Sequence, residues 1–492
     1  MYLGYGLLVT SILLTMATPL TAPSKSFVSA GLDFGSSGAR ISLIRDSDEI
    51  YSRSVKYDDY ADPAEWISAL HTLTSELPTP PVALSISSTS NSLLAVDPST
   101  PTLSPLAVSM YDDAPVLPSD LLQRQQEALQ KGELDAVEGV DYQTPFAKTG
   151  GATKALALLS STSVPASLIY PQSSYILHNL LLSSMPFTAD WNNLMKLGYD
   201  PTAHDYIDAV KNCLGTDATQ KLPSGAPTGT YLGTIDTPDT SLKGCAVYLG
   251  STDSICAFIG ALSASTQSLS DPSSLEGLTV TSLGTTLATK MLSKRRVYDA
   301  SRGVYSHLLP ANVLFESFSC SAPSTANLWL AGGASQAGCR ILRDLEFSPE
   351  ELAHLSTQIP PDMTPTNDLY PLPLNSKGER FPIANDSKQT NVDPSKYETR
   401  LSLLQDVLFG IANNVELEGY KILNELGAPT PSRILTSGGG SNNDQWTVIR
   451  SRLINSWLDP DSDADSPISV SKAPPSRDAA FGAALIAHRS HN

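Results

Sequence analysis

The chain has 492 residues, more than one hydrophobic core ordinarily supports, so two large domains are expected. It carries 32 Lys and Arg residues against 50 Asp and Glu residues, and this net charge of −18 argues against a nucleic-acid partner or an acidic membrane surface. Hydrophobic residues make up 41% of the sequence, as in globular proteins, and no internal run approaches the roughly 20 apolar residues of a membrane span.

The first 26 residues stand apart from the rest of the sequence. They contain an apolar run over 5–16, a tail rich in Thr, Ala, Pro and Ser, and no charge before Lys25. This composition is typical of a targeting segment, but the basic start of a secretory signal is missing. A mispredicted start of the chain is the alternative interpretation. The segment 1–26 is therefore excluded from the predicted fold.

The folded part is expected to begin with a hairpin. An apolar strand over 27–32 runs into the turn residues 33–38, DFGSSG, and the apolar pattern resumes over 39–44. A turn of Gly and Ser exposes several backbone N–H groups together with hydroxyls, an array that binds phosphate oxygens. For one such turn alone, an ordinary hairpin is the more common interpretation.

The next elements alternate in period, with a helix expected over 63–77 and a strand over 82–87. A stretch rich in Gly, Pro and Thr over 222–238 predicts loops. An apolar strand then ends at 247–249 and delivers the carboxylate of Asp253 into a turn. An isolated Asp at such a position is usually a helix cap, so Asp253 becomes a candidate only in combination with other features.

A second hairpin of the same kind follows about half a chain later. The strand over 278–283 leads into Gly284, Thr285 and Thr286, and a strand returns over 287–291. The repetition indicates an internal duplication. Two phosphate-binding turns together suit a polyphosphate ligand.

The last part of the chain continues the alternation. A Pro-rich segment over 359–383 predicts a long surface excursion, and 399–426 predicts a long amphipathic helix. The strand over 433–436 is followed by SGGGSNN at 437–443, where glycines let the backbone approach a ligand closely. Neither a P-loop nor a G-x-G-x-x-G motif occurs, and the alternation as a whole implies α/β layers.

Metal-ligand spacings are missing from the sequence. The seven histidines form no H-E-x-x-H pattern, and the five cysteines form no C-x-x-C pair, so the cysteines are interpreted as reduced thiols. Any metal is expected to be Mg²⁺ carried by a nucleotide.

Five segments taken together resemble the FGGY carbohydrate kinases. They are GLDFGSSGAR at 31–40, GSTDSICAFIGA at 250–261, TSLGTT at 281–286, LTSGGGSNN at 435–443 and DAAFGAALIA at 478–487. Further segments narrow the resemblance to the cyanobacterial and plant plastid D-ribulose kinase branch: DWNNLMKLGYDP at 190–201, GVYSHLLP at 303–310, WLAGGASQAG at 329–338, and LYPLP followed by GERFP up to Pro382. The likeness covers nearly the whole chain after residue 27.

The resemblance implies two actin-like, ribonuclease H-like ATPase domains of α/β class with a ligand cleft between them. Residues 27–256 are expected to form the sugar-binding domain and residues 257–492 the nucleotide-binding domain. The implied function is ATP-dependent phosphorylation of a ketose, from D-ribulose to D-ribulose 5-phosphate. Kinases acting on xylulose, sedoheptulose or glycerol, and a catalytically silent nucleotide-binding protein, are the alternatives. The resemblance and the leader together imply delivery to a chloroplast, with a cytoplasmic protein as the alternative.

The resemblance also assigns roles to single residues. Asp253 matches the catalytic base, and Asp33 lies beside Mg²⁺ and the reacting hydroxyl. The sugar is expected to meet Asp33, Ser90 and Asp253. The residues that match nucleotide contacts are Ser36, Ser37, Gly284, Thr285, Gly332, Gly333, Gly439, Gly440 and Asn443, of which Gly284 and Thr285 meet the γ-phosphate.

Two departures from the family pattern concern the sugar. Many relatives carry Asp-Gly-Thr-Ser after the third strand, where this chain has SSTS at 87–90. Relatives also carry Asp-Trp in a later helix, where this chain has Ser174 and Tyr175. A pocket with fewer buried hydrogen-bonding groups rejects wrong sugars less strongly, so weaker discrimination between pentuloses is expected.

Overall fold

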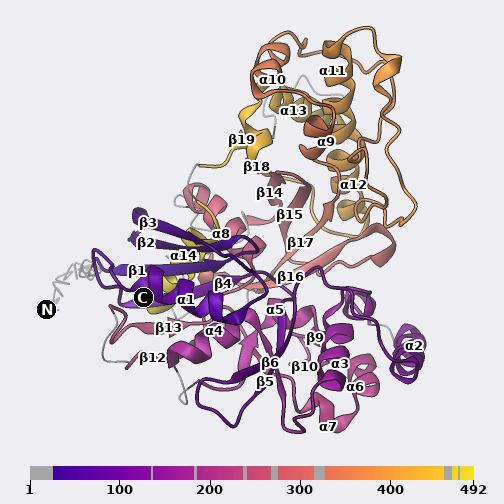
Figure 1. Ribbon diagram of the computed structural model, residues 1–492. Coiled ribbons are helices and arrows are strands. Elements are labelled where there is room, and N and C mark those ends of the chain that lie inside the picture. The colour runs from indigo at the N-terminus through magenta and orange to yellow at the C-terminus, as the bar shows by residue number, and fades with distance from the viewer. Residues whose placement is uncertain are drawn as a thin grey trace, which may run out of the picture.

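The computed structural model describes residues 26–134, 137–181, 185–236, 241–266, 275–314, 327–458, 468–474 and 477–492. The predicted targeting segment 1–26 therefore lies, apart from Ser26, outside the described residues. The chain forms two lobes, one drawn from indigo to magenta and the other mainly in orange and yellow (Figure 1). Among the described helices, none combines the length and the apolar character needed to cross a bilayer.

The first lobe is built on a six-stranded sheet with two predicted elements at its centre. The predicted hairpin is present as the antiparallel pair of β1 and β2, and β4 and β13 follow parallel to β1. In spatial order the strands are β12 (Tyr231–Thr234), β13 (Ala246–Tyr248), β4 (Ala83–Ser88), β1 (Val28–Phe34), β2 (Gly38–Arg45) and β3 (Asp48–Lys56).

The second lobe contains a sheet of the same size. Here the predicted second hairpin is the antiparallel pair of β14 and β15, and the predicted strand over 433–436 is β18, parallel to β14. In spatial order the strands are β16 (Tyr305–Pro310), β17 (Asn327–Ser335), β15 (Leu287–Ser293), β14 (Leu278–Leu283), β18 (Arg433–Ser437) and β19 (Val470–Lys472).

The two sheets share one topology. In each sheet three antiparallel strands that lie side by side are followed by two strands parallel to the first. This gives the spatial order 3-2-1-4-5 when the edge strand β16, which comes between β15 and β17 in the chain, is left out of the count. The series is β3-β2-β1-β4-β13 in the first lobe and β17-β15-β14-β18-β19 in the second. This correspondence confirms the internal duplication indicated by the two hairpins.

Each lobe adds elements to its sheet. In the first lobe α1 begins at Pro63 because Asp62 caps it, accepting a 2.9 Å hydrogen bond from the backbone N–H of Ala64. The further elements of the first lobe are α1 (Pro63–Thr74), β5 (Leu93–Asp97), β6 (Ser104–Ser109), α2 (Ser119–Leu134), α3 (Gly151–Ser161), β7 (Leu168–Pro171), α4 (Gln172–Leu181), β8 (Thr188–Asp190), α5 (Trp191–Met195), β9 (Tyr199–Asp200), β10 (Asp205–Tyr206), α6 (Asp208–Leu214), α7 (Thr216–Thr219) and β11 (Ser224–Ala226).

In the second lobe the predicted long helix over 399–426 is present as one continuous helical segment. A π-helical segment, η7 (Ala412–Leu417), joins its two α-helical parts. Between α10 and this helical segment lies the Pro-rich excursion, in which the structure has no α-helix or long strand. The helices of this lobe are α9 (Arg340–Asp344), α10 (Pro349–Ser356), α11 (Arg400–Ile411), α12 (Glu418–Glu425) and α13 (Asp444–Leu458).

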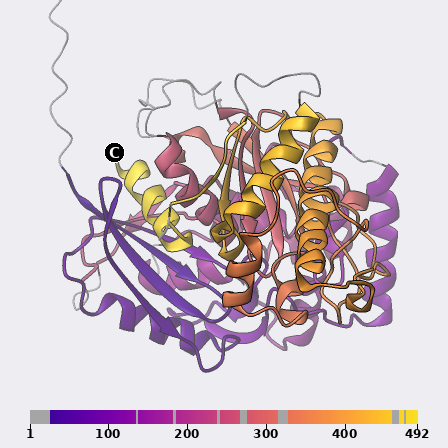
Figure 2. The ribbon, with the colours of Figure 1, turned by 90° about the horizontal axis from the view of Figure 1, so that it is seen from above.

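Two helices cross between the lobes, α8 (Asp253–Thr266) and α14 (Ala479–His491). A Cβ added at Gly482 of α14 would lie 1.7 Å from the carbonyl oxygen of Cys256 in α8, so this crossing requires glycine. Although α14 ends the chain, it packs on β1, β2 and β4 of the first sheet. Figure 2 shows the yellow α14 against the indigo strands. The expected domain boundary between residues 256 and 257 falls inside α8. Each of the two predicted ranges therefore contains part of α8, and α14 of the second range packs on the sheet of the first.

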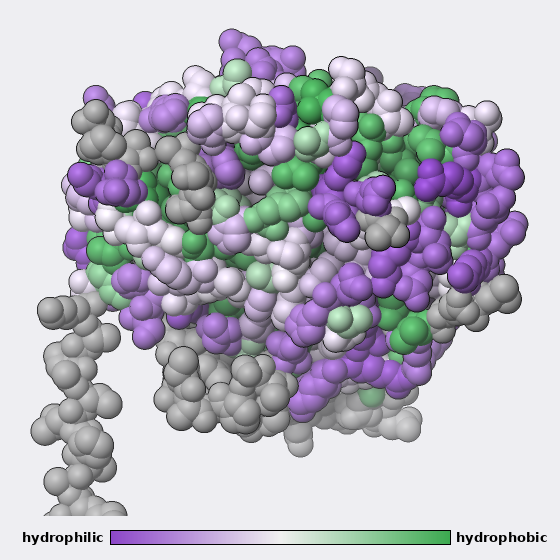
Figure 3. Space-filling view, turned by 90° about the horizontal axis from the view of Figure 1, so that it is seen from below, coloured by the Kyte–Doolittle hydropathy of each residue, from purple (hydrophilic) through white to green (hydrophobic). Residues whose placement is uncertain are grey.

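The cores lie within the lobes and beneath the crossing helices. One apolar cluster contains buried residues of the first sheet and of α1. Another contains buried residues of α8, α14 and the second sheet. On the face of the molecule seen from below, hydrophobic residues show through in separate groups between hydrophilic ones (Figure 3).

Candidate active site

The carboxyl ends of three parallel strands meet at one edge of the first sheet. Asp33, near the end of β1, lies opposite Ser87 of β4, and Ser88 is bridged to Thr252 just after β13. The next residue, Asp253, begins α8. The sequence therefore brings Asp33 and Asp253 to the same edge, as their predicted roles require.

Asp33 is a carboxylate held in the interior with one local donor. Ser87 Oγ donates a 2.8 Å hydrogen bond to Asp33 Oδ1. Burial raises the pKa of Asp33 to about 7; the Ser87 hydrogen bond acts against this rise, and the charges of Asp253 and Asp478 add to it. A buried carboxylate with a nearby like charge favours the approach of a cation.

Asp253 lies in a similar setting but with positive neighbours. Its Oδ1 accepts a 2.6 Å hydrogen bond from the backbone N–H of Ser254. Burial raises the pKa of Asp253, while the Ser254 hydrogen bond and the charges of Lys290 and Lys196 act in the opposite direction. These neighbours help to keep the carboxylate able to accept a proton near neutral pH.

The internal duplication explains why Asp253 has no ion-pair partner among the described residues. Asp478 caps α14 as Asp253 begins α8, and Asp478 forms an ion pair with Arg40 of β2. Arg40 pairs with the penultimate residue of β1, and the residue at the same register position in the second hairpin is Ala288. The side chain that neutralises Asp478 has therefore no counterpart at Asp253, which leaves this carboxylate free for a ligand.

Hydrogen bonds and an ion pair join the two lobes in the region of Asp253. Asn192 of α5 exchanges two hydrogen bonds with the backbone of Leu308 in β16, at 3.0 and 3.1 Å, and donates to Ser251 Oγ at 3.0 Å. Arg296 of the second lobe forms a 2.8 Å ion pair with Asp200 of the first. These contacts hold the edge of the second sheet against the turn that carries the proposed base.

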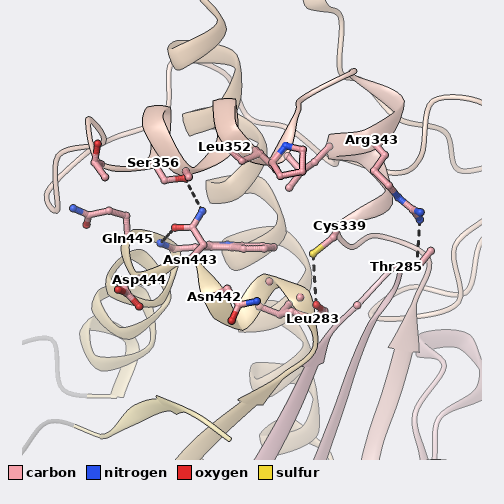
Figure 4. Close-up of a pocket in the computed structure, with 18 residues that line it drawn as sticks. Leu283, Thr285, Cys339, Arg343, Leu352, Ser356, Asn442, Asn443, Asp444 and Gln445 are labelled. Carbon is pink, nitrogen blue, oxygen red and sulfur yellow. Dashed lines mark hydrogen bonds between the residues drawn. The ribbon is translucent and has the colours of Figure 1, made fainter. Parts of the chain in front are cut away.

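A cavity of about 740 Å³ opens in the second lobe, between the β14–β15 turn, α9, α10 and the start of α13 (Figure 4). Its walls combine apolar side chains with backbone and amide groups, as is usual for ligand sites. The lining residues are Leu283, Gly284, Thr285, Cys339, Leu342, Arg343, Pro349, Leu352, Ala353, Ser356, Thr357, Gly439, Gly440, Asn442, Asn443, Asp444, Gln445 and Trp446.

Five of the nine residues predicted to contact the nucleotide line this cavity. They are Gly284, Thr285, Gly439, Gly440 and Asn443. Asn443 supports the wall, because its Oδ1 accepts from the backbone N–H of Trp446 at 2.9 Å and its Nδ2 donates to Ser356 Oγ at 2.8 Å. These two bonds, visible in Figure 4, fix the amide and start α13.

The other four lie elsewhere. Ser36 and Ser37 are exposed in the first turn, outside the cavity lining. Gly332 and Gly333 lie within β17, and a Cβ at Gly333 would come within 2.2 Å of the Phe381 ring. Packing inside the sheet explains why both positions are glycine. The contact of Gly332 and Gly333 with the nucleotide stays a prediction.

The two serines considered for the sugar pocket, Ser90 and Ser174, differ in their surroundings. Ser90 is half-buried in the loop after β4, and its hydroxyl has no partner among the described residues, so it is available to a ligand. Ser174 is 1% exposed and donates to the backbone carbonyl of Thr188 at 3.1 Å. An Asp at position 174 would therefore meet a carbonyl oxygen in the interior.

The sequence reasoning missed several residues around both sites. Lys290 and Tyr305 of the second sheet and Lys196 of the first lobe surround Asp253. The signal for Lys290 is a single charge in the otherwise uncharged strand LATKMLS, which a strand buried on both faces rarely contains. The walls of the cavity, such as Leu352 and Trp446, carried no motif.

Solved structures share the architecture of this chain, whereas no family model matches it. A xylulose kinase from Rhodospirillum rubrum has a TM-score of 0.69 at 17% identity, covering 94% of this chain and 90% of that chain. Plasmodium falciparum glycerol kinase with ADP has a TM-score of 0.70 at 14% identity, with 95% and 90% covered. A gluconate kinase from Lactobacillus acidophilus has a TM-score of 0.67 at 15% identity, with 94% and 89% covered. This likeness confirms the predicted two-domain, actin-like α/β fold.

Proposed function

We propose that the protein is an ATP-dependent carbohydrate kinase that phosphorylates a hydroxyl of a ketose, with D-ribulose as its acceptor. The observation that carries the proposal is the pair of carboxylates, Asp33 and Asp253, at one sheet edge. It is supported by a cavity in the other lobe whose walls include the second Gly-Thr turn. The solved proteins with this fold include xylulose, glycerol and gluconate kinases.

The reaction needs a base for the acceptor hydroxyl and donors for the phosphates. As the hydroxyl oxygen bonds to the γ-phosphorus, the bond from that phosphorus to the β–γ bridging oxygen breaks and ADP leaves. The hydroxyl proton passes to the Asp253 carboxylate. The backbone N–H groups and hydroxyls of the two hairpin turns hold the phosphate oxygens.

Asp33 suits a magnesium ion that accompanies the nucleotide. Its Oδ1 is occupied by Ser87, and its Oδ2 has no donor among the described residues. Mg²⁺ prefers oxygen ligands and is commonly bound through one or two carboxylates plus substrate phosphates, so the donor set fits. The ion would neutralise phosphate charge.

The choice of D-ribulose depends on the sequence resemblance and on Ser90. Ser90 is half-buried and its hydroxyl has no partner among the described residues, so it can form a hydrogen bond with a hydroxyl of the acceptor. Xylulose, sedoheptulose and glycerol are the alternative acceptors.

A coupled ADP-release assay over a set of pentuloses, heptuloses, glycerol and gluconate tests the proposal. The expected result is ADP release with D-ribulose at the highest kcat/KM, together with formation of the 5-phosphate. If only another acceptor is phosphorylated, D-ribulose is wrong as the substrate, but the kinase activity stands. ATP binding without release of ADP for any acceptor would favour a silent nucleotide-binding protein.

A further inference from the structure

Lys290 occupies an unusual place for a lysine. It lies in the middle of β15, where its backbone neighbour in β17 is Gly332, and Gly332 is in turn the neighbour of Tyr305 in β16. The three residues form a row across the sheet. A Cβ at Gly332 would lie 1.9 Å from the carbonyl oxygen of Thr289, so the strands pack closely at the centre of this row. Lys290 Nζ lies 5.8 Å from the centre of the Tyr305 ring.

The side chain of Lys290 is largely buried, and its ammonium lies near the Tyr305 ring. The residue is 8% exposed, and within the described ranges it forms neither a hydrogen bond nor an ion pair. Burial lowers the pKa of Lys290, and the charge of Lys196 lowers it further. A largely buried charge without a hydrogen bond or an ion pair destabilises a fold, so its presence needs a reason other than stability.

A second ammonium lies near the same ring. Lys196, from the end of α5 in the first lobe, lies with Nζ 4.4 Å from the centre of the Tyr305 ring. Asp253 is the acidic residue whose charge acts on Lys290. Around the Tyr305 ring the two ammonium groups therefore outnumber the one carboxylate, Asp253, and leave an excess of positive charge there.

We propose that the Lys290 ammonium binds the phosphoryl group at the acceptor, as it is transferred and in the phosphorylated product. This inference rests on the proposed kinase function and extends it to a residue outside the predicted motifs. A neutral acceptor would leave the excess charge uncompensated, whereas the incoming phosphoryl group supplies the missing negative charge.

The placement agrees with the direction of transfer. The new bond joins the acceptor oxygen to the γ-phosphorus while the bond to the bridging oxygen of ADP breaks, and the proton goes to Asp253. The phosphoryl group therefore ends its path next to Asp253, and the charge of Lys290 in the second lobe acts on that carboxylate. Since Asp33 and Asp253 repel the phosphate oxygens, a cation on this side lowers the repulsion when charge moves to the acceptor.

Equilibrium binding separates this proposal from the proposed function. Titration calorimetry measures the affinities for D-ribulose 5-phosphate, D-ribulose and gluconate in wild type, Lys290→Met and Lys290→Arg. Methionine keeps the length of the side chain and removes the charge. The matched control is Lys294→Met, because Lys294 is exposed and pairs with Glu276 at 3.0 Å.

The expected result is a loss of about 10- to 100-fold in affinity for the phosphate ester in Lys290→Met, with the affinity for D-ribulose nearly unchanged. Lys290→Arg should recover part of the loss, and Lys294→Met should match wild type. The melting temperature of Lys290→Met should equal or exceed that of wild type, because a buried charge is removed.

Three results would overturn the proposal. Equal weakening of both ligands would place Lys290 on the acceptor hydroxyls, and unchanged affinity for both would remove it from the site. A loss seen with gluconate but not with the phosphate ester would assign the charge to an acidic acceptor. ADP release by wild type is measured separately, so a failure of the kinase function is visible independently of these affinities.

Discussion

Ser87 and Asp33 face each other across two parallel strands, and the Ser87 hydroxyl donates a 2.8 Å hydrogen bond to the Asp33 carboxylate. The bond lowers the pKa of a group that burial raises to about 7. At alkaline pH the fold therefore contains an ionised carboxylate in an unfavourable setting. The acidity of Asp33 thus couples the stability of the empty protein to pH.

The first prediction concerns this coupling. The folded pKa of Asp33 is about 7 and the unfolded value is 3.8, so its favourable contribution is complete below pH 3.8 and is lost as pH rises through 7. Asp33→Asn should raise the melting temperature at pH 8, with roughly 4 kcal/mol as an upper limit, and the gain should shrink towards pH 4. Melting scans of both proteins without ligands from pH 4 to 8 check this. A pH-independent difference would contradict it.

The second prediction tests the base. Asp253→Asn keeps the acceptor for the Ser254 N–H and removes the proton acceptor, so turnover should fall by roughly 10² or more. Affinity for ATP should stay close to that of wild type. Asp120→Asn is the control, since Asp120 also lies in the first turn of a helix but is exposed. Near-normal turnover of the Asp253 variant would exclude this assignment.

The third prediction concerns how the base is kept ionised. The charge of Lys196 lowers the pKa of Asp253, against the effect of burial. Lys196→Met should therefore raise that pKa and move the acid limb of the kcat/KM profile to higher pH. A profile between pH 5 and 9 measures the limb. Lys294→Met, which removes an exposed charge, should leave the limb in place.

Local sequence patterns predicted the elements whose structure depends on their own residues. The Gly-containing turns after Phe34 and Leu283 were identifiable because each interrupts an apolar strand and is followed by another. The pairing of Asp33 with Asp253 followed from the family resemblance, and the sheet edge explains it physically. Lys290 was not predicted, because its setting depends on Gly332 in the neighbouring strand and on Tyr305 in the strand beyond it, and no local pattern contains that register.

The fourth prediction separates two adjacent glycines of the cavity wall. A Cβ at Gly439 meets nothing within 4 Å, whereas a Cβ at Gly440 comes within 2.8 Å of Leu283 and 2.9 Å of Trp446. Gly439→Val should keep the melting temperature and lower the affinity for ATP by about tenfold, because its side chain projects into the cavity. Gly440→Ala should instead destabilise the protein by about 1 to 3 kcal/mol. Equal effects of both variants on stability would contradict this distinction.

The last prediction addresses the contact between the lobes at Asn192. Its amide satisfies both backbone groups of Leu308 and also holds Ser251, two residues before Asp253. Asn192→Ala leaves these buried groups without partners, and each such group costs about 1 to 3 kcal/mol, so the urea midpoint should fall clearly. Turnover should fall more than ATP affinity does, because the turn that carries the base loses its support. The exposed Asn212→Ala is the control and should change neither quantity. An unchanged urea midpoint in Asn192→Ala would show that water replaces the amide and that the lobes are held together by other contacts.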